Sequence, residues 1–340
     1  MDQPTIGIYG AGSIGAYVGA HLIKAGLPTI LVGRERLGAE IDAHGLRVTS
    51  LAGTDFLLAP GQVRYHTTPE ALAGCDIVCV TVKSAATPAA RELLPILRPG
   101  AIVVSLQNGV RNAAALREAL PGATVLAGMV PYNVVWNAPA HFHCGTAGAL
   151  AIERQNPATD QVLAAFRRAG LEAGASDHIE GVLWGKLLLN LNNPINALAG
   201  LPLRDELSQA GYRRVLAAAM AEALGLLRAA GIRPAGAAGA PPALVPAILR
   251  LPDPLFQRVA RRMLAIDPQA RSSMWEDIQR GRTTEIDYIN GEVALLAEAL
   301  ERPAPVNRRL IELIKALEAG DQRLANLSAA ELAWRTGLLD

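Results

Sequence analysis

Hydrophobic and polar positions follow one pattern before residue 178 and another after it. The first part has short continuous apolar runs bounded by glycine or proline, as is typical of buried parallel strands, at 5–9, 29–32, 76–82 and 101–106. The second part has long stretches rich in Ala and Leu that predict helices, at 179–198, 208–230 and 272–299. The pattern predicts an α/β Rossmann-type domain over 1–177 and an all-helical domain over 178–340.

The first apolar run leads directly into a glycine-rich turn. Residues 10–15 read Gly10-Ala11-Gly12-Ser13-Ile14-Gly15, an amphipathic stretch follows to Lys24, and the second strand ends at Val32. In such a βαβ unit this glycine spacing is typical of a dinucleotide site. We expect Gly10 to permit the tight turn, Gly12 to leave room for the pyrophosphate and Gly15 to let the helix pack closely, with the helix N-terminus facing the phosphates. The alternative is a structural turn without a ligand.

The residues after the second strand indicate which dinucleotide is bound. Domains that prefer NAD place a carboxylate there for the ribose hydroxyls, whereas this chain has Gly33-Arg34-Glu35-Arg36. A guanidinium can hold a 2′-phosphate through two hydrogen bonds. The sequence therefore favours NADPH, with Arg34 as the phosphate contact. An ordinary solvated loop arginine is the alternative.

Polar residues follow the next two predicted strands. One strand runs into Lys83 and the other into Gln107-Asn108-Gly109. Ligands of open α/β sheets bind outside the carboxyl ends of the strands, so Lys83 and Asn108 are candidate ligand contacts. A solvated lysine at a helix start and a tight Asn-Gly turn are the alternatives.

Composition excludes several classes of partner. Of 340 residues, 51% are hydrophobic and 19% charged, which indicates a globular protein. The formal net charge of +1 provides no general attraction to nucleic acid or to an anionic membrane surface. Charged residues interrupt every long apolar run, and the first residues do not resemble a signal peptide, so we expect a cytoplasmic protein without a membrane span.

Cysteines and histidines indicate neither a disulfide framework nor a metal site. Cys75, Cys79 and Cys144 are few and odd in number, so we expect buried thiols. His141 and His143 alternate along a predicted strand without an evident third ligand, which favours a structural role.

Two segments of the helical domain carry candidate chemistry. Lys186, Asn190 and Asn193 have the i, i+4, i+7 spacing that places side chains on one helix face. A polar stripe among apolar residues should face a cleft. The alternative is a solvent-exposed helix surface, with the helix ending at Pro194. Further on, Ser272 or Ser273 either caps a helix or binds a ligand.

The segment 283–291 reads TTEIDYING, and its Glu285 and Asp287 are either functional or solvated. The small, proline-rich residues 235–247 predict a helix connection or a surface loop.

Taken together, these segments resemble the ketopantoate reductase (2-dehydropantoate 2-reductase) family over most of the chain. That family has, in order, a GxGxxG turn, a TVK strand end, an NG turn, a W-x-K-L helix with Asn four residues after its Lys, an SSM-x-x-D segment and a TEIDYING stretch. All are present here. The family commonly has a further Asn eight residues after its Lys, where this chain has Pro194 preceded by Asn193.

The resemblance implies a role for each candidate residue. Lys186 would be the catalytic acid, Arg34 would meet the 2′-phosphate, and Lys83 and Asn108 would border cofactor and substrate. It further implies substrate contacts at Asn190 and Ser273 and a cofactor contact at Glu285; Asn193 is a weaker substrate-binding candidate.

The implied activity is NADPH-dependent reduction of 2-dehydropantoate to (R)-pantoate, a step of pantothenate and coenzyme A synthesis. Hydride would pass from nicotinamide C4 to the ketone carbon of this small-molecule substrate. Another 2-oxo acid as substrate, or a non-catalytic NADPH sensor, are the alternatives. The oligomeric state stays open, and a homodimer fits because closed two-fold assemblies are the commonest.

Overall fold

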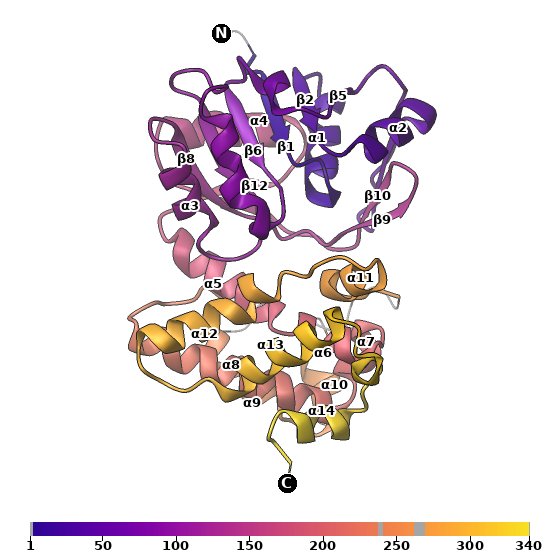
Figure 1. Ribbon diagram of the computed structural model, residues 1–340, viewed down its shortest axis with the longest axis vertical. Helices are drawn as coiled ribbons and strands as arrows, with labels where there is room; N and C mark the ends of the chain where they lie inside the picture. The colour runs from indigo at the N-terminus through magenta and orange to yellow at the C-terminus, as the bar shows by residue number, and fades with distance from the viewer. Residues whose placement is uncertain (1–2, 237–240, 262–268, 340) are drawn as a thin grey trace. The chain divides into compact units, whose positions relative to one another are not determined.

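The computed structural model describes residues 3–236, 241–261 and 269–339. The chain divides into two compact units, Met1–Ile179 and Glu180–Asp340. Figure 1 colours them from indigo through magenta to yellow along the chain. The fold class expected from the sequence is confirmed, because unit 1 contains a largely parallel sheet flanked by helices and every regular element described in unit 2 is helical.

An eight-stranded sheet organises unit 1, in the order β12-β11-β8-β7-β6-β1-β2-β5. From β5 to β8 neighbouring strands are parallel. The strands are β1 (Ile6–Tyr9), β2 (Thr29–Val32), β5 (Arg64–His66), β6 (Ile77–Val80), β7 (Ile102–Ser105), β8 (Thr124–Met129), β11 (Leu150–Glu153) and β12 (Ala173–Ser176).

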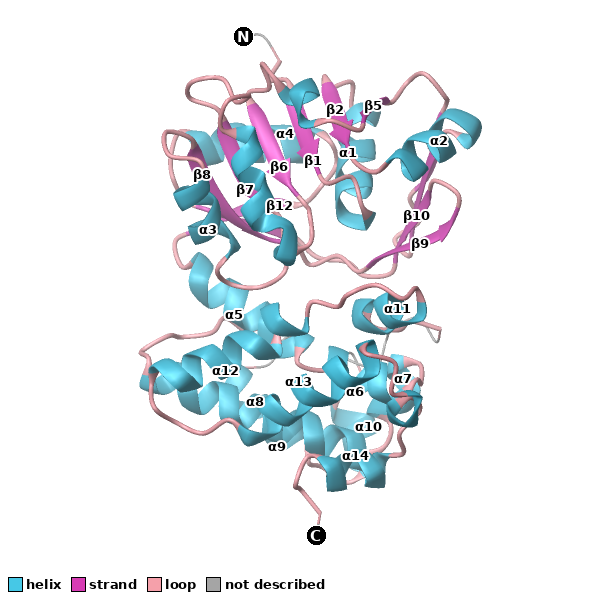
Figure 2. Cartoon of the chain, viewed as in Figure 1, coloured by secondary structure: helices cyan, strands magenta, loops and turns pink. Residues whose placement is uncertain are grey.

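The helices of unit 1 flank this sheet (Figure 2). They are α1 (Ser13–Lys24), α2 (Glu35–His44), α3 (Asn112–Ala119) and α4 (Ala158–Arg168), with 3-10 helices η1 (Pro69–Leu72) and η2 (Ser84–Leu93). The predicted strands β1, β2, β6 and β7 are confirmed. Every residue of β1, β6 and β7 is buried, which explains why each reads as an unbroken apolar run.

A smaller sheet was not predicted. It has the order β4-β3-β10-β9, with β3 (Leu46–Ser50), β4 (Asp55–Leu58), β9 (Val134–Ala138) and β10 (His141–Cys144). His141 and His143 lie on β10 as expected, and both rings contact the hydroxyl of Thr49 on β3 at 2.9 and 2.8 Å. Cys75, Cys79 and Cys144 are buried free thiols, as expected.

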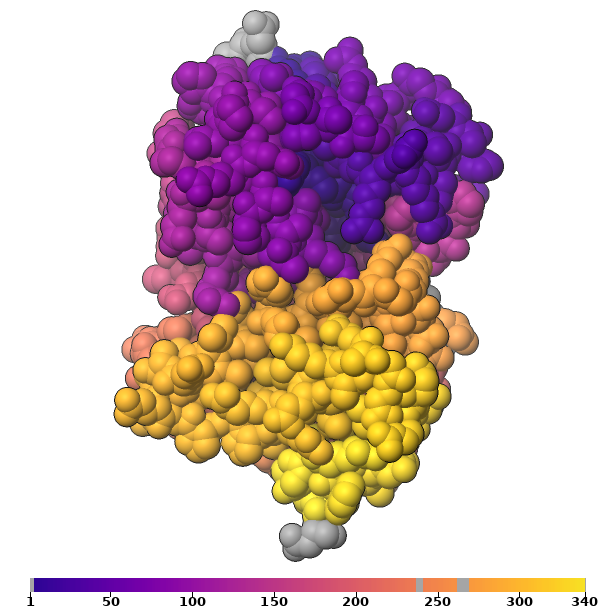
Figure 3. Space-filling view, in the orientation of Figure 1, coloured from indigo at the N-terminus to yellow at the C-terminus, as the bar shows by residue number. Residues whose placement is uncertain are grey.

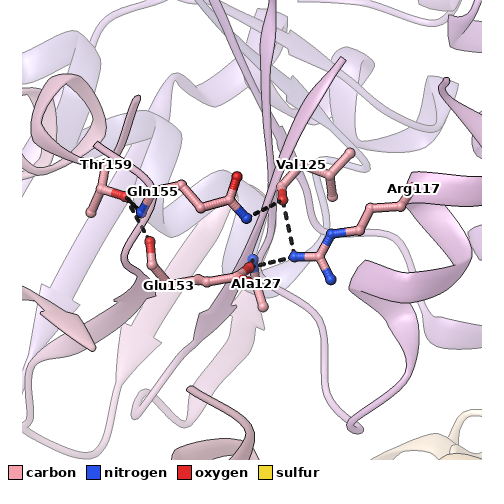
Figure 4. Close-up of polar contacts among 6 residues, drawn as sticks. All are labelled: Arg117, Val125, Ala127, Glu153, Gln155 and Thr159. Carbon is pink, nitrogen blue, oxygen red and sulfur yellow. Dashed lines mark hydrogen bonds and ion pairs between the residues drawn. The ribbon is translucent and has the colours of Figure 1, made fainter. Parts of the chain in front are cut away.

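The large sheet changes direction at β11, which pairs antiparallel with β8. There the carboxylate of Glu153 accepts a hydrogen bond from the Ala127 backbone N–H at 2.8 Å and pairs with Arg117 at 2.5 Å, while Arg117 also donates to the Val125 carbonyl (Figure 4). The hydroxyl of Thr159 donates to the Glu153 carbonyl at 2.7 Å. The Glu153 side chain thus supports the ladder where β8 and β11 meet and binds α3 there, while the Glu153 backbone carbonyl binds α4.

Unit 2 consists of helices: α5 (Ile179–Asn190), α6 (Asn193–Ala199), α7 (Leu203–Leu207), α8 (Ala210–Ala229), α9 (Val245–Leu249), α10 (Asp253–Val259), α11 (Ser273–Gln279), α12 (Asn290–Ala299), α13 (Pro305–Glu318) and α14 (Ala329–Arg335), with η3 (Pro242–Leu244), η4 (Ile286–Tyr288) and η5 (Gln322–Leu324). The long helix α8 packs against α7, α9, α12, α13 and α14. In the space-filling view the orange and yellow segments of this unit pack into one body (Figure 3).

The expected helix over 179–198 is wrong in one respect. α5 ends at Asn190, and α6 begins at Asn193, with a turn between them. Pro194 lies in the first turn of α6, where its missing N–H costs nothing, so it does not stop the helix. Lys186 and Asn190 therefore share α5, while Asn193 belongs to the next helix.

The expected helix over 272–299 is also interrupted. α11 ends at Gln279, Gly281 has a φ of +59° that favours glycine, and α12 begins only at Asn290. Of the proline-rich residues 235–247, those at 237–240 lie outside the described residues, and those at 242–247 belong to η3 and to the first part of α9. No helix among the described residues is long and apolar enough to cross a membrane.

Candidate functional site

The candidate residues of unit 1 follow neighbouring parallel strands. The glycine turn follows β1, Arg34 follows β2, Lys83 follows β6 and Asn108 follows β7. These four strands are adjacent in the sheet and parallel, so their carboxyl ends lie along one edge. The structure therefore gathers these candidates at the edge where open α/β sheets bind ligands.

The glycine turn is tight at both ends and open in the middle. Gly10 has a φ of +102°, and a Cβ there would lie 2.5 Å from the Val82 nitrogen. A Cβ on Gly15 would lie 2.7 Å from the Gly10 carbonyl oxygen and 2.8 Å from Ile8, so helix and strand approach closely. A Cβ on Gly12 would meet only the Gly10 carbonyl oxygen, at 3.9 Å. This arrangement matches the three glycine functions expected from the sequence.

The N-terminus of α1 fits a phosphate group. Its N-cap residue is Gly12, which has no side chain to cap the helix, and no acidic residue lies in the first turn. The first N–H groups of a helix and its dipole favour an anion, and the open space at Gly12 lies at this end. These residues fit the pyrophosphate of a dinucleotide.

Arg34 lies on the loop after β2 with an exposed side chain. Its carbonyl accepts a hydrogen bond from the Tyr65 hydroxyl at 2.8 Å, which fixes the backbone. Among the described residues no acid pairs with its guanidinium. Arg36, by contrast, is engaged with Glu40 at 2.9 Å and stacks on Trp136. Of these two arginines, Arg34 is thus the one available to an anionic ligand.

Lys83 and Asn108 lie at the starts of the segments that follow β6 and β7. Lys83 is the N-cap residue of η2 and is partly buried, so it is not a fully solvated lysine. Asn108 is partly buried and precedes Gly109, whose φ is +92°. Both residues thus lie just beyond the carboxyl ends of their strands and are only partly exposed.

A buried polar network that the sequence did not indicate joins these two segments. The Gln107 amide donates to the Thr87 hydroxyl at 2.7 Å, and Thr87 donates to the Asn112 side chain at 2.8 Å. The Ser84 hydroxyl donates to the Asn108 carbonyl at 2.9 Å. The network holds Asn108 in place relative to η2. Its partners lie 20 to 25 residues apart in the chain, so spacing alone could not reveal it.

In unit 2, Lys186 lies on α5 one turn before Asn190. Lys186 is partly exposed, but protein atoms surround it densely enough that burial lowers the pKa of its ammonium group below the ordinary value. Burial is the cause of this shift in the pKa of Lys186. A lysine in this state gives up its proton more readily than a solvated one.

The two serines before α11 differ in role. Ser272 is 4% exposed and caps the helix by accepting a hydrogen bond from the Trp275 N–H at 3.1 Å. Its hydroxyl also donates to the Asn193 carbonyl at 3.2 Å. Ser273, the first residue of α11, is exposed. The structure therefore assigns the capping role to Ser272 and brings Asn193 and the start of α11 together.

Glu285 immediately precedes η4, and its carbonyl accepts a hydrogen bond from the Tyr288 N–H at 2.9 Å. It is partly buried, whereas Asp287 is exposed and pairs with Lys315 at 2.7 Å. The described residues contain no group of three or more His, Cys, Asp or Glu side chains that could hold a metal ion.

Comparisons with known proteins cover nearly the whole chain. The family model described as ketopantoate reductase PanE/ApbA matches residues 6–157, and its C-terminal model matches residues 178–318. A 2-dehydropantoate 2-reductase of Halobacterium salinarum is 30% identical over 315 residues, which is 91% of this chain and 97% of the relative.

Solved structures agree. A PanE/ApbA family ketopantoate reductase from Ralstonia eutropha superimposes with a TM-score of 0.80 at 32% identity, covering 94% of this chain and 99% of that one. The ternary structure of a D-mandelate dehydrogenase with NADH and anilino(oxo)acetate shares the fold, with a TM-score of 0.76 at 19% identity over 93% of this chain and 98% of the other.

Proposed function

The chain belongs to the ketopantoate reductase family of oxidoreductases, and on that premise we propose that it reduces 2-dehydropantoate to (R)-pantoate with NADPH. This reaction is a step of pantothenate and coenzyme A synthesis. The observation that carries the proposal is Lys186, a lysine whose pKa burial lowers, one helical turn from Asn190.

Arg34 supports NADPH over NADH. The fold does not choose between the two cofactors, since a protein of the same fold is known with NADH. Arg34 is exposed, and no acid among the described residues pairs with its guanidinium, so it is available to a 2′-phosphate. In unit 1 the other proposed cofactor contacts are the glycine turn, the N-terminus of α1, Lys83 and Asn108. In unit 2 the proposed cofactor contact is Glu285.

Lys186 would act as the general acid. NADPH, when bound, supplies the hydride that reduces the ketone. Negative charge develops on the carbonyl oxygen, and a cationic Lys186 stabilises this charge and donates its proton there. The lowered pKa of Lys186 assists the donation near neutral pH.

The remaining polar residues would hold the 2-oxo acid. Asn108, Asn190, Asn193 and Ser273 offer amide and hydroxyl groups that can orient a carboxylate and a hydroxyl. Such residues contribute by positioning, so their loss should mainly raise KM. Loss of Lys186 should instead lower kcat.

The test follows NADPH oxidation with 2-dehydropantoate in wild type and Lys186→Met. We expect a fast wild-type rate that falls by about 100-fold or more in the variant, the typical contribution of a general acid. Lys24→Met, at the exposed last residue of α1, is the matched control and should keep the wild-type rate.

An inactive wild type that still binds NADPH would remove 2-dehydropantoate as the substrate. The place of Asn193 favours a second candidate for that case, another 2-oxo acid, because Asn193 lies one position before the family's usual Asn and begins a new helix. A panel of 2-oxo acids would identify it. Inactivity with all of them would favour an NADPH sensor.

We further propose that the chain forms a homodimer, since closed two-fold assemblies are the commonest among soluble oligomers. Sedimentation velocity should then show a species of twice the 35.7 kDa of one chain. A species of the single-chain mass at all concentrations tested would exclude the homodimer.

A further inference from the structure

The proposed reaction leaves one buried carboxyl group unexplained. Glu206 lies on the short helix α7 and has no exposed surface. Among the residues that the structure describes, no cation pairs with it. An ionised carboxylate in such a place is costly, because neither water nor a counter-charge stabilises it.

The hydrogen bonds of Glu206 fit a neutral acid. Its Oε2 accepts from the amides of Asn192 at 3.1 Å and Asn196 at 2.9 Å. Its Oε1 is buried without a partner, and so is Oδ1 of Asn192. Both of these atoms can only accept hydrogen bonds when Glu206 is ionised. A proton on Oε1 turns that atom into a donor, and the Glu206 side chain is already hydrogen-bonded to Asn192.

Burial raises the pKa of Glu206 to about 8, and the hydrogen bonds from Asn196 and Asn192 lower it by less. At neutral pH the acid form therefore predominates. The pKa and the hydrogen-bonding pattern agree.

This group is connected to the proposed substrate residues. Asn196 uses its Oδ1 to accept a hydrogen bond from the Ser272 N–H at 2.8 Å, and the Ser272 hydroxyl donates to the Asn193 carbonyl. Asn192 directly precedes Asn193, and Ser272 directly precedes Ser273. Hydrogen bonds through Asn192 and Asn196 thus connect Glu206 to both segments that carry proposed substrate contacts.

We propose that Glu206 is a positioning residue: as a neutral carboxylic acid it fixes Asn192 and Asn196, and through them the places of Asn193 and Ser273. Its effect on substrate rests on the proposed function, in which these two residues bind the 2-oxo acid. Its effect on the start of α11 does not.

The titratable groups on α6 and α8 provide no counter-charge for Glu206. α6 carries no titratable side chain. On α8, Tyr212 donates its hydroxyl to the Leu327 carbonyl, and burial, with smaller contributions from Glu206 and Glu331, raises the pKa of Tyr212. Arg213 is occupied by backbone carbonyls and by Asp253 at 2.7 Å.

Two variants separate the neutral acid from a carboxylate. Glu206→Gln keeps an acceptor for the two amides and adds N–H donors for Asn192. Glu206→Leu leaves the Asn192 amide without its acceptor, and the Asn196 amide keeps only its hydrogen bond to the Leu201 carbonyl at 2.9 Å. We expect E206Q to keep the wild-type KM for the 2-oxo acid at pH 7. E206L should raise KM about tenfold or more with a smaller change in kcat. Asp205→Asn, at the exposed neighbouring position, is the matched control.

Above pH 8 the wild-type KM should rise, because Glu206 ionises there, and E206Q should lack that part of the rise. Burial also lowers the pKa of Lys186 and raises that of Tyr212, so the comparison is between wild type and E206Q at each pH.

Two readouts do not depend on activity. The infrared difference spectrum of wild type minus E206Q at pH 7 should contain a protonated-carboxyl band, and wild type minus D205N should not. Amide hydrogen exchange at the first turn of α11 should be fast in E206L and slow in wild type and E206Q. Should the wild type reduce no 2-oxo acid, the proposed function fails, and these two measurements still decide the role of Glu206.

Three results would overturn the inference. They are a missing carboxyl band, an E206Q variant whose KM rises as far as that of E206L, and unchanged exchange of α11 in E206L. If E206L does not fold, E206Q and the infrared band decide alone.

Discussion

At the scale of single residues, Ser272 and Ser273 are neighbours in different environments, so variants of the two can distinguish helix capping from substrate binding. Ser272 is buried and caps α11, while Ser273 is exposed. Ser272→Ala should lower the free energy of unfolding by about 1 kcal/mol, the usual cost of a lost N-cap. Ser273→Ala should leave stability unchanged and raise KM for the 2-oxo acid. Urea denaturation and steady-state kinetics of both variants check this, and the reverse result would exchange the two roles.

The pH dependence of turnover should report on Lys186. Its acid form is the active one, and burial lowers its pKa. Turnover should therefore fall as pH rises, on a limb below the ordinary lysine value of 10.5. In Lys186→Arg, any residual activity should persist to higher pH, because a guanidinium keeps its proton. A pH-rate profile of both proteins measures this, and identical alkaline limbs would argue against Lys186 as the acid.

Glu206 should also leave a signature in stability. Its pKa is raised from 4.5 to about 8, so between these values the folded chain binds more protons than the unfolded chain. The free energy of unfolding must then fall as pH rises through this window. In E206Q this contribution should vanish. Urea unfolding of both proteins from pH 5 to pH 9 checks it, and parallel curves would show that Glu206 is ionised throughout.

At the scale of elements, two glycines of the turn should have different roles: Gly15 in helix packing and Gly12 in cofactor binding. Gly15→Ala places a Cβ 2.7 Å from the Gly10 carbonyl oxygen and should cost about 1–3 kcal/mol of stability. Gly12→Val enters open space, so it should fold normally and lose NADPH affinity. Denaturation and NADPH titration measure the two effects, and undiminished affinity of Gly12→Val would remove the site.

The elements that could be predicted from sequence are those whose burial is uniform along the strand. β1, β6 and β7 are buried at every position, and continuous apolar runs reveal them. β3 and β4 mix buried and exposed residues over a few positions, so their pattern is weak. For the same reason the small sheet was missed.

The helix break near residue 191 accompanies contacts that no local pattern contains. The sequence pattern around 190–193 predicts one continuous helix. The side chains of Asn192 and Asn196 bind the buried Glu206, which lies 10 to 14 residues away, so a local pattern does not reveal these contacts. The candidate residues of unit 1 follow from strand ends and glycine spacing. The network that holds Asn108, and the capping role of Ser272, required the folded structure.

At the scale of the whole molecule, cofactor choice should appear as a difference in stability. A ligand that binds only the folded state raises its stability in proportion to the logarithm of its concentration over Kd. NADPH should therefore raise the melting temperature more than NADH at equal concentration. Arg34→Ala should bring the two shifts together. Differential scanning fluorimetry measures them, and equal shifts in wild type would remove the preference for NADPH.

The small sheet of unit 1 has a consequence for how the chain is made. It pairs β3 with β10, and Thr49 meets His143 across 94 residues of sequence. A ribosome adds roughly 5–20 residues per second, so β3 waits about 5–20 s for its partner strand. During that interval the hairpin of β3 and β4 exposes an unpaired strand edge. While the stretch between the two halves of this sheet is translated, the nascent chain is therefore open to pairing with another chain, or to binding by a chaperone that prevents such pairing.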